Sequence, residues 1–289
     1  MKILITLFLL IAAVVAHATS TSLNVAISVT HQGGGTLGCL SDSICPPAPS
    51  GFQWSNDVNS DFTTGTIPAG WRMPADNVAN PIPDFATGED CHTTGTYFQW
   101  VTGTNNNYLR LDIPPFGSNS GGLANACQVD TDNRTLVMGP GFFEFNIAYD
   151  LGSDHASWLV STHDSNCQPS NVAWENDMPE AGTTSFIWNG YFDPPNFCHQ
   201  QSNQDCNNCW QAFPNFQLSG MWWVTNGPQH MYYNGTEYTV FNPPQGAGDI
   251  NSAGTPIAII ENKQFSGGCR PCSGGMYIKW FRHYSLVAG

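Results

Sequence analysis

Short runs of alternating apolar and polar residues, separated by turn residues, recur along most of the chain. This period of two is typical of β-strands, because successive side chains of a strand point to opposite faces of a sheet. No stretch shows the helical period over three turns. The pattern predicts strands over residues 108–113, 141–151, 156–163, 184–192, 220–226, 230–241, 256–262 and 276–286.

The run over residues 230–241 contains Asn234-Gly235 between two β-rich halves, which predicts a hairpin with a two-residue turn. Many strands without intervening helices predict an all-β fold, either a sandwich or a barrel. The proline-rich stretches 45–51 and 76–85 are expected to be loops. A chain of 289 residues fits one large β domain.

The first residues have the pattern of a secretory signal peptide. Lys2 precedes an apolar run over residues 3–15, and Ala16-His17-Ala18 is a small-residue cleavage site. The run is shorter than a membrane span, although an N-terminal anchor is the alternative. We therefore expect a signal peptide over residues 1–18, a single domain over 19–289, and a secreted, extracellular protein without a membrane segment.

An even number of cysteines in a secreted chain predicts disulfide bonds. The spacing Cys-x-x-Cys occurs at 206–209 and 269–272, and these two pairs are an alternative zinc site with four thiolates. Residues 133–135 and 234–236 are acceptors for N-glycosylation. The ten cysteines are Cys39, Cys45, Cys91, Cys127, Cys167, Cys198, Cys206, Cys209, Cys269 and Cys272.

The formal net charge of −14 argues against nucleic acid and anionic polymers as partners, because both would be repelled. A neutral partner fits better. Only 10% of the residues are charged, whereas aromatic residues make up 12%. This composition suits a secreted β protein with a stacking surface, and it is compatible with an enzyme or with a lectin.

One short stretch departs from this low charge. In residues 173–182, "AWENDMPEAG", Glu175, Asp177 and Glu180 fall within six consecutive positions. In a regular strand Glu175 and Asp177 share one face and Glu180 lies on the other. One β-bulge restores Glu180 to the shared face. Pro179 favours a bulge at Met178-Pro179, because proline within sheets is largely confined to edges, first positions and bulges.

Two carboxyl groups on one face are what hydrolysis of a glycosidic bond with retention requires, at a separation of about 5–5.5 Å. One ionised carboxylate attacks the anomeric carbon, and one protonated carboxyl group donates to the leaving oxygen. Like charges nearby raise the pKa of the acid and keep it protonated. The alternative is a solvated acidic turn without a catalytic role.

The pattern E-x-D-x-x-E over residues 175–180 resembles the catalytic strand of glycoside hydrolase family 16, which includes laminarinases and agarases. The order of the surrounding segments is also similar to that family, and the resemblance spans roughly residues 51–286. A second resemblance, of residues 175–181 to family 7 cellulases, ranks behind it because those chains are longer and end differently. The family 16 segments are 51–72, 108–113, 138–161, 216–236, 256–262 and 276–286.

The resemblance to family 16 implies a β-jelly-roll sandwich of two antiparallel sheets with a concave substrate cleft, and retaining hydrolysis of a β-linked polysaccharide. Glu175 would be the nucleophile, Asp177 its assistant and Glu180 the general acid/base. No cofactor is required. Many relatives hold a structural calcium ion, for which this sequence identifies no ligands.

Four positions depart from the family pattern. Asn176 and Pro179 replace residues that are usually apolar, Gln217 stands where histidine is common, and Asn234 replaces the aspartate of a turn. These changes concern the substrate more than the chemistry, because all three acids are present.

Tryptophan side chains bind the apolar faces of sugar rings, because a large rigid surface loses water at little entropic cost. Trp158 and Trp174 are nearest in sequence to the acidic strand, and Trp223 occupies a family-like strand position. His155 precedes the strand that contains Trp158. These four residues are the predicted substrate-binding residues, and the alternative for each is a structural position.

The sequence thus predicts a secreted, monomeric endo-acting glycoside hydrolase on a neutral β-linked polysaccharide. β-1,3-Glucan is the first choice of substrate and a galactan such as agarose the second. A non-catalytic lectin on the same fold is the alternative, although it is disfavoured because both Glu175 and Glu180 are present. A disulfide-linked structural wall protein is the third class.

Overall fold

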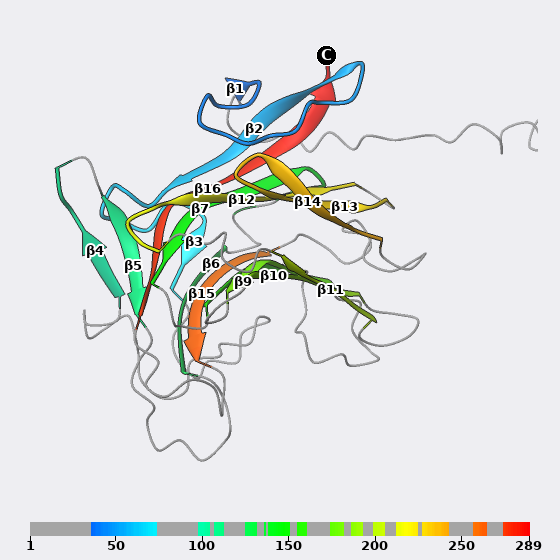
Figure 1. Cartoon of the computed structure of the whole chain (residues 1–289). Helices are drawn as coiled ribbons and strands as arrows, with labels where there is room; N and C mark the ends of the chain where they lie inside the picture. The colour runs from blue at the N-terminus through cyan, green and yellow to red at the C-terminus, as the bar shows by residue number, and fades with distance from the viewer. Residues whose placement is uncertain are drawn as a thin grey trace, which may run out of the picture. The chain divides into compact units, whose positions relative to one another are not determined.

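The computed structural model describes residues 36–73, 98–104, 107–112, 125–131, 136, 138–150, 155–160, 174–181, 186–192, 199–205, 212–224, 227–242, 257–264 and 274–289. All of them belong to one compact unit, His31–Gly289. Within these ranges every regular element is a β-strand, and the strands form two antiparallel sheets (Figure 1). The described residues include no helix long and apolar enough to cross a membrane. The all-β prediction is confirmed.

The first sheet, sheet A, has the C-terminal strand at its centre. β16 pairs with β2 on one side and with β7 on the other, so strands distant in sequence are neighbours. The order is β1-β2-β16-β7-β12-β13-β14, with β5 also beside β16 and β4 beside β5. The strands are β1 (Thr36–Leu37), β2 (Phe52–Asp61), β4 (Phe98–Val101), β5 (Tyr108–Asp112), β7 (Phe142–Tyr149), β12 (Gln217–Trp223), β13 (Gln229–Tyr233), β14 (Thr236–Phe241) and β16 (Gly275–Ala288).

The second sheet, sheet B, has the order β11-β10-β9-β8-β15-β6-β3. Its neighbours also include strands far apart in sequence, since β15 pairs with both β8 and β6. These long connections between antiparallel strands are those of the jelly-roll sandwich that we expected. The strands are β3 (Trp71–Arg72), β6 (Asn125–Thr131), β8 (His155–Val160), β9 (Trp174–Ala181), β10 (Phe186–Phe192), β11 (His199–Asp205) and β15 (Ile257–Gln264).

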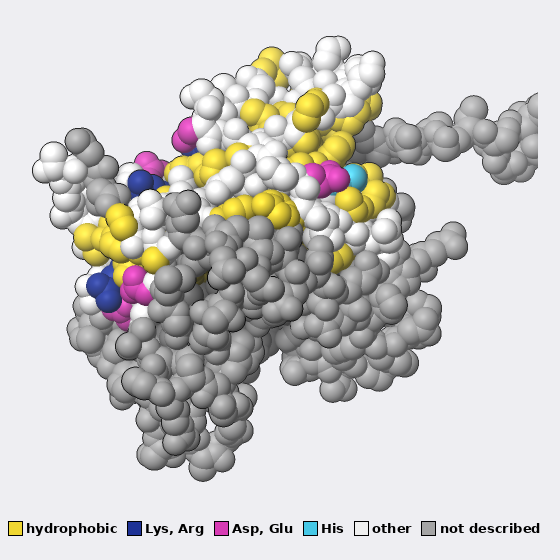
Figure 2. All heavy atoms as spheres, viewed as in Figure 1, with side chains coloured by type: hydrophobic (Ala, Val, Ile, Leu, Met, Phe, Trp, Pro, Cys, Tyr) yellow, Lys and Arg dark blue, Asp and Glu magenta, His cyan; other side chains and the backbone are white. Residues whose placement is uncertain are grey.

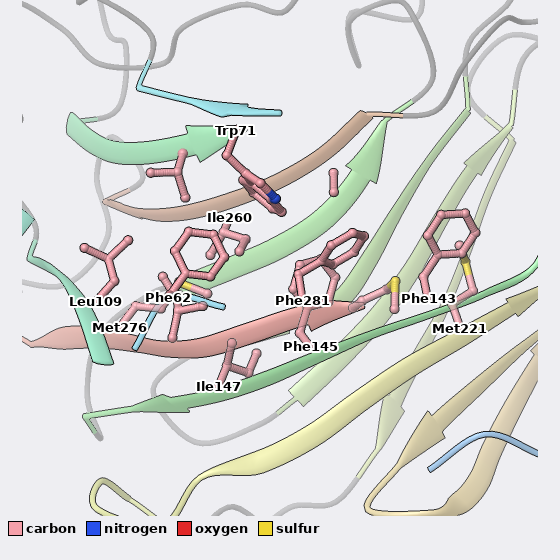
Figure 3. Close-up of a cluster of buried hydrophobic side chains, with 14 of the residues drawn as sticks. Phe62, Trp71, Leu109, Phe143, Phe145, Ile147, Met221, Ile260, Met276 and Phe281 are labelled. Carbon is pink, nitrogen blue, oxygen red and sulfur yellow. The ribbon is translucent and has the colours of Figure 1, made fainter. Parts of the chain in front are cut away.

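The hydrophobic core lies between the two sheets. Phe145 and Phe281 of sheet A have ring centroids 4.8 Å apart, and Trp71 of sheet B packs against Phe281 at 5.4 Å. Ile260 of sheet B is fully buried in the same cluster (Figure 3). Full burial of such a side chain contributes roughly 1.5–3 kcal/mol. The residues that face this core identify the inner face of each sheet.

The outer face of sheet A is covered at one end by the segment 38–50, which includes the disulfide bond Cys39–Cys45. The backbone N–H of Ile44 donates to Glu144 at 3.0 Å, and the Tyr284 hydroxyl donates to the same carboxylate at 3.1 Å. Burial raises the pKa of Glu144 despite these hydrogen bonds. A polar contact therefore fixes this covering segment on the sheet.

An aromatic cluster covers another part of the outer face of sheet A. Phe213 stacks on Tyr277 with centroids 4.0 Å apart, and Tyr108 packs edge-on against both rings at 5.4 Å. Phe216 lies 5.7 Å from Tyr108. The segment 212–216 is thereby held against sheet A.

Most predicted strands coincide with observed ones. The predicted hairpin is confirmed, since Tyr233 pairs with Thr236 across a two-residue turn. Asn234 has φ = 45° and Gly235 has φ = 85°. Positive φ at both turn residues is the type I′ geometry that asparagine and glycine accommodate. The predicted loop at 45–51 contains no strand, whereas the loop at 76–85 lies outside the described residues.

Our pattern analysis did not predict the strands β1, β2, β3, β4, β6 and β11. In β2 buried and more exposed residues alternate, but the buried positions include the polar residues Asn56 and Ser60. The strand therefore lacks the alternation of apolar and polar residues by which we predicted strands. β11, with the sequence HQQSNQD, contains no apolar residue. Its strand conformation follows from pairing with β10, which the sequence of β11 alone does not reveal.

The disulfide prediction is confirmed where the structure describes the cysteines. Cys39 bonds to Cys45, and Cys127 is also disulfide-bonded. Both Cys-x-x-Cys pairs, the remaining cysteines and the predicted signal peptide lie outside the described residues.

Candidate active site

The acidic stretch forms β9 (Trp174–Ala181), which lies between β8 and β10 in sheet B. Glu175 pairs with Val160 of β8 and with Tyr191 of β10. Neighbours on both sides supply hydrogen bonds along the strand, so β9 is an interior strand. The expectation of an extended conformation here is confirmed.

A bulge interrupts β9 between Asp177 and Glu180. On the β8 side, Asp177 pairs with Trp158 and Glu180 with Ala156, so three steps along β9 match two steps along β8. The β10 side shows the same mismatch, because Asp177 pairs with Asn189 and Glu180 with Ile187. β9 therefore carries one extra residue at Met178-Pro179, as the sequence predicted.

The register places the three acid positions in one row of the sheet. Their partners on β8 are Val160, Trp158 and Ala156, which alternate with Leu159 and Ser157. Residues two apart in a regular strand lie on one face. Glu175, Asp177 and Glu180 are thus positions of a single face.

That face is the outer one. Ala258 and Ile260 of β15 are fully buried in the core, and they pair with Leu159 and Ser157 of β8. Met178, next to Asp177 in β9, is also fully buried in the core cluster. Because neighbouring positions alternate between faces, the row of acids lies on the side of sheet B that faces away from sheet A.

Of the four predicted substrate-binding residues, Trp158 shares the face of the acids, since it is in register with Asp177. Trp174 directly precedes Glu175 and so belongs to the opposite, core-facing row. His155 is in register with Asn262, which is fully buried on the core face. The register therefore separates Trp174 and His155 from the acids.

Trp223 requires a correction. Its side chain is only 2% exposed and belongs to the core cluster between the sheets. A ring enclosed in the core offers no face to a sugar, so we assign Trp223 to packing. The family-like position of this tryptophan reflects the fold, because alternate residues of β12 face the core.

An ion pair that the sequence analysis missed lies on the same outer face. Arg72 of β3 donates through Nε to Asp130 of β6, which is fully buried, and Gln128 Nε2 donates to Asp130 at 3.1 Å. Asp130 pairs with Ile259, which pairs with Trp158, so this row continues the row of Asp177. β6 is three strands from β9, or about 14 Å. The two partners are 58 residues apart, and no local motif marks them.

Among the described atoms that Figure 2 shows, charged side chains form small separate groups and no continuous patch. Within the described residues, no group of three His, Cys, Asp or Glu side chains could hold a metal ion. The conceivable donors in the two Cys-x-x-Cys pairs lie outside them. The register on β9 puts three acid positions in one row of a sheet, and carboxyl groups can take part in acid–base and nucleophilic chemistry.

No protein-family model and no curated protein sequence matches this chain. Solved structures do match its fold. The laminarinase from Rhodothermus marinus superposes with a TM-score of 0.59 at 13% identity, covering 81% of this chain and 98% of that one. SCLam, a non-specific endo-β-1,3(4)-glucanase from glycoside hydrolase family 16, gives a TM-score of 0.54 at 15% identity, covering 83% of this chain and 93% of that one.

A third match is an endo-β-galactosidase from Clostridium perfringens that releases GlcNAcα1-4Gal. Its TM-score is 0.55 at 15% identity, and the match covers 85% of this chain but 65% of that protein. The chain has the jelly-roll fold of the family 16 glycoside hydrolases, as its sequence predicted.

Proposed function

We propose that this chain, which has the fold of family 16 glycoside hydrolases, is a secreted retaining endo-glycoside hydrolase of neutral β-linked polysaccharides. The bulge in β9 is the observation that carries the proposal. It places Glu175, Asp177 and Glu180 in one row on the outer face of sheet B, although their spacing in sequence would divide them between two faces.

In the first step, the Glu175 carboxylate attacks the anomeric carbon and forms a covalent glycosyl-enzyme. Glu180 donates its proton to the glycosidic oxygen, so the leaving sugar departs as a neutral alcohol. In the second step, Glu180 as a carboxylate removes a proton from water, which attacks the same carbon and releases Glu175. Two inversions give net retention.

Asp177, between the two glutamates, helps to separate their roles. A carboxyl group beside Glu175 and Glu180 adds negative charge to the row, and that charge raises the pKa of the group that must stay protonated. A hydrogen bond to the nucleophile would orient it toward the sugar. The reaction needs no cofactor, and the proposed enzyme acts as a monomer outside the cell.

For the substrate, we favour a β-1,3-glucan and place a neutral galactan second. The net charge of −14 disfavours a polyanionic chain. The superposed structures include a laminarinase and an endo-β-galactosidase, which agrees with both choices. Trp158, in register with Asp177, is the tryptophan that we place beside the bond to be cleaved.

The test is a reducing-sugar assay on laminarin, lichenan, agarose and a sulfated galactan. We expect cleavage of laminarin first, with Glu175→Gln lowering kcat at least about 10³-fold, because the variant lacks the nucleophile. NMR of the first product should show the β-anomer before mutarotation. An initial α-anomer, or equal activity of the variant, would overturn the mechanism.

A matched control is Glu237→Gln. Glu237 is an exposed glutamate on β14 of sheet A, where it accepts hydrogen bonds from Tyr232 and pairs with His230 at 2.8 Å. This variant removes the same charge from the other sheet and should keep full activity. If the wild type binds laminarin without cleaving it, the chain is a lectin on the same fold.

A further inference from the structure

Lys279 differs from the other described cationic side chains in its partners. Arg72, Arg110 and Arg282 each form an ion pair, with Asp130, Asp112 and Asp42 respectively. In the part of the chain that the structure describes, the Lys279 ammonium pairs with no carboxylate. Its contact is with the ring of Phe216, 4.2 Å from Nζ to the centroid.

The backbone directs Lys279 to this place. Along β16, Ile278 pairs with Ile147 and Trp280 with Asn146, so Lys279 is the extra residue of a β-bulge. Bulges re-aim a side chain relative to the regular sheet. The Phe62 N–H donates to the Lys279 carbonyl at 2.8 Å and holds the bulge.

Lys279 lines a cavity of about 370 Å³ on sheet A. Gln217 and Tyr233 form its buried part, whereas Asn215 and Asn234 are exposed at its rim. One N–H of the Asn215 amide bonds to the Ala212 carbonyl at 3.1 Å, which leaves the second for a ligand. The cavity thus combines a cation with uncharged polar groups.

We propose that this cavity binds an oxyanion, a sulfate or carboxylate group, with Lys279 as its cation. An ammonium that is partly removed from water, and that pairs with none of the described carboxylates, gains most from a charged acceptor, because hydrogen bonds between ions are about twice as strong as neutral ones. Burial lowers the pKa of Lys279, in agreement with an uncompensated charge.

The site is independent of the proposed catalysis. It lies on sheet A, whereas Glu175 and Glu180 belong to the outer face of sheet B. The remaining acidic residues repel an anion over long distances, but salt at 0.15 M screens charges beyond about 8 Å. The oxyanion could be a substituent of a sugar or a free inorganic ion, and both sources present the same group to Lys279.

The test is isothermal titration calorimetry of the secreted chain with galactose 6-sulfate, galactose and inorganic sulfate, at fixed ionic strength. We expect galactose 6-sulfate to bind at least about tenfold tighter than galactose, the factor that one charged hydrogen bond supplies. Weaker binding of inorganic sulfate would identify a sugar as the source of the oxyanion. Equal binding of inorganic sulfate would identify a free ion.

Two variants remove the site by different routes. Lys279→Gln removes the cation, and Asn215→Asp places a carboxylate at the exposed rim, where it can pair with Lys279 and block the ligand. Both should abolish the preference for galactose 6-sulfate over galactose, and Lys279→Arg should retain it. Unchanged binding by Lys279→Gln and Asn215→Asp, or no preference in the wild type, would overturn the proposal. Cleavage of laminarin should be the same in all three variants.

Discussion

At the scale of single residues, the environment decides what a carboxyl group does. Asp57 and Glu144 both lie in sheet A, and burial acts on both. At Asp57, the neighbouring His283 imidazole and the hydrogen bonds from Ser285 outweigh burial and lower the pKa, whereas burial prevails at Glu144 and raises its pKa. We propose that differences in local environment likewise give the three acids of β9 their separate roles as nucleophile, assistant and general acid/base.

The acid–base role of Glu180 predicts a dependence on the leaving group. Glu180→Gln should lower kcat on laminarin by about 10²–10⁴-fold, because the leaving sugar needs a proton. Formation of the glycosyl-enzyme from an aryl glycoside with an acidic phenol should be affected far less, since such a leaving group departs unprotonated. Pre-steady-state release of the phenol measures this step, and an equal loss on both substrates would contradict the role.

Asp57 predicts a loss of stability in acid. Its Oδ2 lies 2.9 Å from His283 Nδ1, and the Ser285 N–H donates to Oδ1 at 3.1 Å. Because its pKa is lowered in the fold, its contribution is complete above the ordinary value of 3.8 and is lost as the pH falls through the folded pKa. Asp57→Asn should lower the free energy of unfolding at pH 7 by about 1.5–3 kcal/mol.

Urea unfolding between pH 7 and pH 2.5 checks this prediction. The wild type should lose stability relative to Asp57→Asn at the acid end, so that the two curves converge. The control is Asp61→Asn. Asp61 is an exposed aspartate of the same strand, and its carboxylate accepts a hydrogen bond from the Thr63 N–H. A constant difference between wild type and Asp57→Asn at every pH would refute the assignment.

At the scale of elements, β-bulges direct the side chains that matter for function. One bulge in β9 keeps Glu180 in the row of Glu175 and Asp177. Another in β16 sets Lys279 apart from the regular alternation. In each case the extra residue shifts the alternation of side chains by one position. A strict period of two would therefore assign the residues after the bulge to the wrong face of the sheet.

The bulge in β9 predicts opposite outcomes for the deletion of one residue and the deletion of two. Without Pro179, only Met178 separates Asp177 from Glu180, and all three acids still share a face. Activity on laminarin should persist, lowered up to about 10²-fold by displacement of Glu180. Deletion of both Met178 and Pro179 makes Glu180 follow Asp177 directly, which moves Glu180 to the core-facing row.

The variant that lacks both residues should therefore have no more activity than Glu175→Gln. Reducing-sugar assays and unfolding midpoints of both variants provide the comparison, because a variant that fails to fold is recognised by its midpoint. Pro179→Ala, which keeps the length of the strand, is the control and should remain active. A double deletion as active as the single deletion would show that the face of Glu180 does not matter.

At the scale of the whole molecule, the two sheets separate two proposed functions. The outer face of sheet B has the row of acids, and sheet A has the cavity of Lys279. Side chains of both sheets form the core between them (Figure 3). Substitutions that reach the inner face of either sheet therefore affect the packing of both. Fold similarity at 13–15% identity shows that the jelly-roll fold itself tolerates extensive sequence change.

The proposed secretion predicts where the mature chain begins. Expression of the full chain in a secreting host should yield extracellular protein with Thr19 as its first residue, since Ala16-His17-Ala18 fits a signal peptidase. Ala18→Leu should block the cut, because the last position accepts small residues. Mass spectrometry of the intact protein measures both. An uncut wild-type chain held in the membrane would favour the anchor instead.

The sequence by itself determined the local features of this protein. Alternation of apolar and polar residues indicated most strands, Asn234-Gly235 indicated the turn, and Pro179 marked the bulge that brings three acids into one row. Each is a preference of a few neighbouring residues, which the backbone expresses without help from distant parts of the chain.

The tertiary structure alone decided which face is which. Alternation shows that Trp158 and Trp174 lie on particular faces of their strands, but not which of the two faces packs against the other sheet. That choice follows from pairing with strands far away in sequence, such as β15 beside β8. The strand pairing assigns Trp174, Trp223 and His155 to core-facing positions, away from the acids. Only packing against the partner sheet determines which face of a strand is buried.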